Sequence, residues 1–203
     1  WKGKTTSDLA TSYMAPEALL AIEHNIFTPG NYFYNGVGHV TVCYGRIAQE
    51  GLESIQAQAA EALSKVQFGD ADYARRTHFL QAVIIACEAA CVYAERYADL
   101  ARKEAEACSD PTRKAELLQI AENCSRVPRH GARNFYEACQ SFWFIQMLLQ
   151  MESSGHSISP GRFDQYMYPF FKADLDKGLI TREFAQELMD CIWVKLNDLN
   201  KVR

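Results

Sequence analysis

The sequence predicts a mainly α-helical fold, and three observations lead to this prediction. Apolar residues recur at spacings of three and four over several long stretches, which is the pattern of one helical face. Asp110-Pro111 and Thr181 are helix-start signals of the kind found at the first turn. Only one stretch, residues 38–44, alternates as a strand does. A chain of 203 residues is long enough to bury a substantial core in one domain or at most two.

The first two predicted helices lie on either side of a glycine-rich segment. Ser7 is a candidate N-cap for a helix over residues 10–21, and a second helix is expected over residues 47–66. The third predicted helix begins near Asp70 and has the clearest pattern. Its apolar face contains Tyr73, Leu80, Val83, Ile84, Cys87, Cys91, Ala94, Ala98 and Ala101. Because many of these residues are Ala or Cys, we expect neighbouring helices to pack closely against this face.

Two more helices are predicted in the middle of the chain. Asp110 can cap the free amides of a helix that runs towards Cys124, and Val127-Pro128 ends it. The next helix, residues 132–151, is apolar almost all round, so we expect it to be buried on most sides.

The last part of the chain contains a loop followed by two helices. The loop, residues 152–162, is rich in Gly and Ser, and the helices are expected over residues 163–177 and 181–199. The strand-like stretch, residues 38–44, stands alone in this pattern. One short strand cannot form a sheet by itself, so the sequence leaves its partner unknown.

Composition excludes some classes of partner. The formal net charge is −4, and charges of both signs are interspersed, so no basic face is available for nucleic acid. The longest uninterrupted apolar runs are far shorter than the roughly 20 residues that span a bilayer. We therefore expect neither a nucleic-acid partner nor a membrane.

The seven cysteines are odd in number and irregular in spacing. This pattern is typical of free thiols in a reducing cytosol rather than of a disulfide framework. Cys87 and Cys91 share a helical face, but no second pair completes a metal site, so we interpret them as core residues.

Two segments combine glycine with a histidine: residues 31–40 and residues 152–164. Glycine allows close approach to the backbone, and the neighbouring hydroxyl and aromatic groups suit a small polar ligand. Reasoning from the residues alone leaves both a ligand role and a structural role open for these loop histidines.

Other candidate groups are interpreted as structural. Arg162 and Asp164 are expected to form a local ion pair, and Glu88 and Glu95 are expected to be solvated carboxylates on a helix. His24, His78 and His130 are interpreted in the same way, as surface or core residues. No metalloprotease, phosphate-loop, nucleophile-elbow or dinucleotide motif is present, so hydrolase and kinase functions lose their support.

The block Glu152-Ser-Ser-Gly-His-Ser-Ile-Ser-Pro-Gly-Arg-Phe-Asp-Gln-Tyr-Met-Tyr-Pro-Phe170 closely resembles a signature of the pyruvate formate-lyase-like domain of glycyl radical enzymes. The resemblance continues in residues 31–44, 93–98, 127–128, 135–141 and 193–203. It therefore spans essentially the whole chain. With Trp1 at the start and an amphipathic pattern cut short at Arg203, we expect residues 1–203 to be a partial domain, truncated at both ends.

The resemblance implies a fold in which this chain is one mainly α part of an α/β barrel, with two parallel half-sheets inside a helical shell. In that family a stored glycyl radical passes to a cysteine, which takes a hydrogen atom from the substrate, and a separate radical S-adenosylmethionine activase installs the radical. No cysteine loop or glycine loop of the family type is present here, and Cys91 lies in a helical pattern. Both catalytic residues are therefore expected after Arg203, and this chain alone is expected to be inactive.

The resemblance is strongest to the glycerol and propanediol dehydratase branch. It implies that His39, His156 and Ser157 contact the hydroxyls of a diol substrate. It further implies a cytoplasmic, oxygen-sensitive lyase that is a homodimer at full length, either free or within a bacterial microcompartment. No bound metal or nucleotide is expected in this chain.

Two alternatives remain. Other branches of the family cleave carbon–nitrogen or carbon–sulfur bonds, decarboxylate, or transfer acyl groups, and Cys43 stands where many relatives carry an acidic residue. The second alternative is a non-catalytic helical module that packs against a partner. If the chain is part of a larger body, the helix over residues 132–151 is expected to show a large exposed apolar patch.

Overall fold

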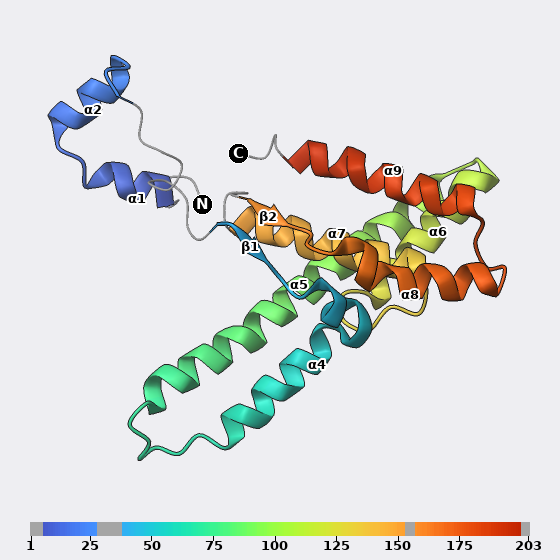
Figure 1. Cartoon of the computed structure of the whole chain (residues 1–203), viewed down its shortest axis with the longest axis horizontal. Coiled ribbons are helices and arrows are strands. Elements are labelled where there is room, and N and C mark those ends of the chain that lie inside the picture. The colour runs from blue at the N-terminus through green and yellow to red at the C-terminus, as the bar shows by residue number, and fades with distance from the viewer. Residues whose placement is uncertain (1–5, 28–37, 153–156, 200–203) are drawn as a thin grey trace.

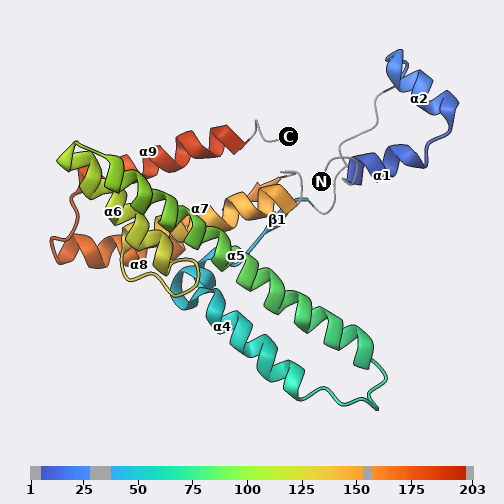
Figure 2. The same cartoon turned by 180° about the vertical axis from the view of Figure 1, so that it is seen from behind.

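The computed structural model describes residues 6–27, 38–152 and 157–199, and it is mainly helical, as predicted. The elements are α1 (Thr6–Ser12), α2 (Pro16–Glu23), β1 (Val40–Thr41), α4 (Tyr44–Ser64), α5 (Tyr73–Ala107), α6 (Pro111–Arg126), α7 (Phe135–Glu152), β2 (Ile158–Ser159), α8 (Phe163–Asp176) and α9 (Arg182–Leu199). Helix α7 contacts α4, α5, α6, α8, α9 and β2. It is the centre of the body, while α4 and α5 form a hairpin that projects from it (Figures 1 and 2).

Helix α5 confirms the clearest sequence pattern and packs lengthwise on α4 and α6. Its contact face is built from small residues, and Cys91, Ala94, Ala98 and Ala105 are each 1% exposed. Short side chains let the helix axes approach closely, so the Ala and Cys content has a packing cause. By length and composition alone α5 is apolar enough to cross a membrane, but this is weak evidence for a helix that packs on two neighbours.

Helix α4 contains a sharp break at Gly51, which has a φ of 77°. At this break the amide of Leu52 donates to the carbonyl of Pro128 at 2.8 Å, and the amide of Ala132 donates to the carbonyl of Ala48 at 2.8 Å. A Cβ atom on Gly51 would lie 2.3 Å from the carbonyl oxygen of Arg129. Only glycine allows this contact between α4 and the segment that connects α6 to α7.

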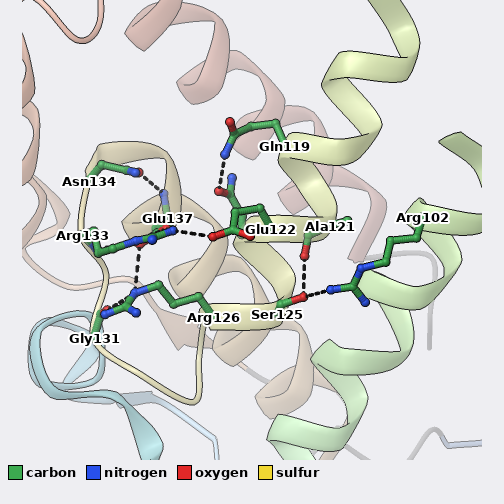
Figure 3. A network of polar contacts seen from close by, with 11 residues as sticks. Arg102, Gln119, Ala121, Glu122, Ser125, Arg126, Gly131, Arg133, Asn134 and Glu137 are labelled. Atoms are coloured by element: carbon green, nitrogen blue, oxygen red, sulfur yellow. Dashed lines mark hydrogen bonds and ion pairs between the residues drawn. The ribbon is translucent and has the colours of Figure 1, made fainter.

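The start of α6 was predicted correctly. The Asp110 carboxylate accepts hydrogen bonds from the amides of Thr112 at 2.9 Å and Arg113 at 3.4 Å, so it caps the helix. The start of α7 has its own cap, because the Asn134 side chain accepts from the Glu137 amide at 2.8 Å. The connection between these helices also holds a polar network around Glu137 (Figure 3).

Helix α7 is buried on most sides, as predicted, and no residue from Phe135 to Gln150 is exposed. The expectation of a large exposed apolar patch on this helix was therefore wrong. The surrounding helices cover α7, and large exposed apolar side chains lie on other parts of the chain, α5 and α9 among them. They include Phe79 at 66%, Ile85 at 68%, Trp193 at 65% and Val194 at 62%.

Two further expectations are corrected. The single helix expected over residues 10–21 is two helices, because Pro16 is the first residue of α2 and the chain turns before it; Ser7 lies inside α1 and is not its N-cap. Glu88 and Glu95 are not simply solvated, since both pair with Arg129 at 3.0 Å. Within the described residues the seven cysteines are free, and Cys87 and Cys91 are buried as expected.

Candidate functional site

The candidate site is built on the only strand pair in the described residues. β1 and β2 are parallel, with Val40 opposite Ile158 and Thr41 opposite Ser159. His39 directly precedes β1, and Ser157 directly precedes β2. Because parallel strands run in the same direction, these two residues occupy equivalent positions at the same end of the pair.

His39 and Ser157 share an unusual backbone conformation. Their φ angles are 57° and 55°, in the left-handed region that residues other than glycine rarely adopt. Such a conformation costs about 1–3 kcal/mol at each residue, and strain of this kind gathers at functional sites. Two strained residues at equivalent positions of paired strands indicate a site rather than a simple connection.

An open hollow of about 320 Å³ lies over the strand pair and is lined by both strands and by His39 and Ser157. Four of the six lining residues, His39, Thr41, Ser157 and Ser159, carry side chains that can form hydrogen bonds. His39 and Ser157 are exposed, so these groups are accessible to a ligand. Hydroxyls and an imidazole can each donate and accept hydrogen bonds, which suits a small molecule with several hydroxyl groups.

The C-terminal side of β2 is held by two contacts. The Tyr166 hydroxyl, on α8, donates to the carbonyl of Pro160 at 2.9 Å. Gly161 has a φ of 67°, and a Cβ atom there would lie 2.6 Å from a methyl of Thr41, so glycine allows β1 to lie close. Within the described part of the predicted loop, Gly161 thus lets the two strands lie close together, and Pro160 accepts a hydrogen bond from α8.

A cluster of aromatic rings packs next to the strands. Tyr44, the first residue of α4, lies 5.0 Å from the Phe142 ring and 6.0 Å from the Tyr166 ring, centroid to centroid. Burial raises the pKa of Tyr44 to about 12, so its hydroxyl keeps its proton at neutral pH. That hydroxyl donates to the side-chain oxygen of Gln146, whose amide nitrogen donates to the Ile158 carbonyl at 3.1 Å.

The structure brings together two of the three residues proposed for the site. His39 and Ser157 line one hollow, whereas His156 lies outside the described residues. Sequence reasoning missed that residues 158–159 form a strand, and it missed Thr41, Ser159 and Gln146 as part of the site. The one available signal for Gln146 was a polar residue within the apolar run from Phe142 to Leu149.

A larger hollow of about 500 Å³ lies between α5, α6, α7 and α9, with Trp143 and Phe144 among its lining residues. Its walls are mostly apolar and contain none of the proposed site residues. We therefore assign the site to the smaller hollow, where hydrogen-bonding groups converge. The described residues contain no group of three or more His, Cys, Asp or Glu side chains able to hold a metal ion.

Comparisons with known proteins identify the family of the chain. A family model described as pyruvate formate lyase-like matches residues 1–203. A protein whose structure was solved in work on 1,2-propanediol dehydration in Roseburia inulinivorans is 60% identical to this chain in sequence. The two structures match with a TM-score of 0.84, and the match covers 98% of this chain and 24% of that one. The B12-independent glycerol dehydratase from Clostridium butyricum, solved with glycerol bound, is 55% identical, with a TM-score of 0.81 over 98% of this chain and 25% of that one.

The relatives are not all dehydratases. An isethionate sulfite-lyase from Desulfovibrio desulfuricans is 41% identical over 206 residues, which covers 96% of this chain and 24% of that protein. The chain thus spans about a quarter of the length of the relatives it matches. Family match, fold and motifs agree along the whole sequence, and the chain belongs to the pyruvate formate lyase-like family of glycyl radical enzymes, near its diol dehydratase branch.

Proposed function

We propose that the full-length protein is a B12-independent diol dehydratase and that this chain supplies the substrate side of its active site. The observation that carries the proposal is the parallel register that sets His39 and Ser157 at one end of the strand pair, beside a hollow that both strands line. The reaction would remove water from a vicinal diol and leave an aldehyde, with no net oxidation or reduction. A glycyl radical and a cysteine, expected after Arg203, would supply removal and return of the hydrogen atom.

The residues of this chain would bind the diol and assist departure of water. In the proposal the His39 imidazole and the Ser157 hydroxyl each hydrogen-bond one substrate hydroxyl, and His156 joins them. Imidazole titrates near neutral pH, so a histidine can donate a proton to a hydroxyl that leaves as water. The surrounding structure holds the strained backbone of His39 and Ser157, so their positions would be set before the ligand arrives.

Sequence identity supports the dehydratase branch over the others. Identity to the two structures of diol dehydration exceeds identity to the isethionate sulfite-lyase. The second candidate is therefore a carbon–sulfur lyase of the same family, acting in the same hollow. In either case we propose a radical S-adenosylmethionine activase as partner, a homodimer and a cytoplasmic location, free or in a microcompartment.

The test begins with the reading frame beyond Arg203, where a cysteine loop and a glycine loop are expected. The full-length protein is then activated anaerobically and offered glycerol, propane-1,2-diol and isethionate. Aldehyde formation from a diol supports the proposal, whereas sulfite release from isethionate alone would assign the second candidate. A reading frame that lacks both the cysteine loop and the glycine loop would exclude the enzymatic function. Only the alternative of a non-catalytic helical module that packs against a partner would then stand.

Variants test the proposed contacts. His39→Ala is expected to lower kcat/KM about 100-fold or more, because general acid assistance is worth about 10²–10⁴. Ser157→Ala is expected to lower it about tenfold, as one hydrogen bond is lost. The matched control is His78→Ala, an exposed histidine on α5 that is distant in sequence from both strands and lines neither hollow. Equal activity in all three variants would contradict the assignment.

A further inference from the structure

Gln146 is a polar side chain in the interior of the molecule. It is 2% exposed and lies on α7, the helix at the centre of the body. Burying an amide costs free energy unless its donors and acceptor find partners. Gln146 accepts from the Tyr44 hydroxyl and donates to the Ile158 carbonyl at 3.1 Å, so this polar side chain is buried with partners.

The orientation of the Gln146 amide follows from these two partners. A backbone carbonyl can only accept a hydrogen bond, so the side-chain nitrogen must face Ile158. The oxygen then faces Tyr44, whose buried hydroxyl donates to it. Reversing the amide would place two acceptors against each other at Ile158. The contact is therefore directional, which a purely apolar contact would not be.

The two partners of Gln146 belong to the two segments that form the site. Tyr44 begins α4, just after β1, and Ile158 is the β2 residue that follows Ser157. Tyr166 and Gly161 hold the far side of β2, and neither contacts Ile158 in this way. The Gln146 side chain on α7 therefore contacts both segments that contain the strands.

We propose that Gln146 is a positioning residue that holds β2 and, through Tyr44, the β1 segment in the register that keeps Ser157 and His39 at one hollow. The inference rests on the proposed function for its effect on turnover, but its structural part is independent of the substrate. Gln146 itself does not reach the hollow, since it is buried and is not among the lining residues. It acts through the backbone of β2 and through Tyr44.

The sharpest variant is Gln146→Glu, tested in the activated full-length protein. Glutamate has nearly the same shape, but it can donate to Ile158 only when protonated. The ratio of the variant's kcat/KM to the wild-type kcat/KM is expected to fall at least tenfold as the pH rises, because the introduced carboxyl ionises. Gln146→Leu is expected to lose activity without this trend, because leucine has no donor at any pH. Glycyl radical content, measured by electron paramagnetic resonance, should stay at the wild-type level in both variants.

The matched control is Gln140→Glu, on the same helix but lining the larger, apolar hollow. Its activity ratio is expected to stay constant across pH. Equal pH profiles for the two glutamate variants would overturn the proposal. So would full activity of Gln146→Leu.

A second measurement does not depend on the substrate. Hydrogen exchange of the unactivated full-length protein, followed by mass spectrometry, is compared for Gln146→Leu and wild type. Faster exchange is expected in both residues 38–44 and residues 157–163, with Gln140→Leu unchanged in both. If exchange rises in both segments but no diol is consumed by the wild type, the proposed function fails and the positioning role stands. If neither segment changes, the positioning role fails.

Discussion

The two ends of helix α7 contact their surroundings through different chemistry. At the N-terminal end, the Glu137 carboxylate is 0% exposed and accepts from the amide of Arg133 at 2.7 Å and from its guanidinium at 2.9 Å. Arg126 lies 3.5 Å from the same carboxylate (Figure 3). At the C-terminal end, the neutral amide of Gln146 contacts β2, and the polar groups beyond it are exposed.

The difference separates a structural junction from a candidate site. The charges around Glu137 are satisfied by groups of this chain, which leaves no carboxylate oxygen for a ligand. At the strand pair the uncharged side chains of Gln146 and Tyr44 hold the backbone, while His39 and Ser157 line a hollow and are exposed. We expect changes at the first end to alter stability and changes at the second end to alter turnover.

The largest effect on stability is expected from Glu137→Ala. Removing the buried carboxylate leaves the Arg133 amide without its acceptor, while the half-exposed Arg133 guanidinium keeps Glu122, so the cost is about 3 kcal/mol of unfolding free energy. Urea unfolding of wild type and variant measures the change. The control is Glu122→Ala, which removes an ion pair to the same Arg133 at 3.0 Å from a carboxylate that is 59% exposed. A loss as large in Glu122→Ala would show that burial does not set the cost.

A smaller loss is expected from Asp174→Ala, at the same end of α7. The Asp174 carboxylate, on α8, is 3% exposed and accepts from the Phe135 amide at 2.7 Å. An unsatisfied buried amide costs about 1–3 kcal/mol. Asp174→Asn keeps an oxygen acceptor and should recover most of the stability in the same urea measurement. If both variants lose equally, the hydrogen bond is not the cause.

At the other end, Tyr44 predicts a dependence of stability on alkaline pH. Burial raises its pKa to about 12, above the value of about 10 for an unfolded chain. The unfolded state therefore releases the proton first, so the stability that Tyr44 contributes is complete below pH 10 and is lost as the pH rises towards 12. Tyr44→Phe cannot titrate, and it should be less stable than wild type at pH 8 but lose this disadvantage near pH 12. Urea midpoints across pH test this, and a constant difference would contradict it.

The sequence predicted those features that depend on neighbouring residues. The Asp110 cap, the small-residue face of α5 and the buried character of α7 follow from local patterns, and the structure confirms them. The sequence also contained a signal for the break before Pro16, because a proline within a helical pattern favours a helix boundary. The prediction missed this break because apolar residues continue at helical spacing on both sides of it.

The site could be predicted only in part, and the reason is its long-range geometry. Strands of two residues carry no readable alternation, so the pairing of β1 with β2 could not be deduced from local patterns. His39 and Ser157 were placed together by family resemblance rather than by spacing. The contacts of Gln146 depend on where α4 and β2 meet α7, and no sequence period specifies that meeting point.

The smallest effect is expected from Arg162→Ala, just after β2. Arg162 and Asp164 form an ion pair at 3.2 Å, and their side chains are 70% and 71% exposed. Water solvates both charges after the pair is broken, so the urea midpoint is expected to stay within experimental error of the wild type. Glu137→Ala and Arg162→Ala each break a contact between an arginine and a carboxylate, but the Glu137 carboxylate is buried whereas the Asp164 side chain is 71% exposed. A loss comparable to that of Glu137→Ala would mean that the strand end also depends on charge, and the distinction between the two ends of α7 would fail.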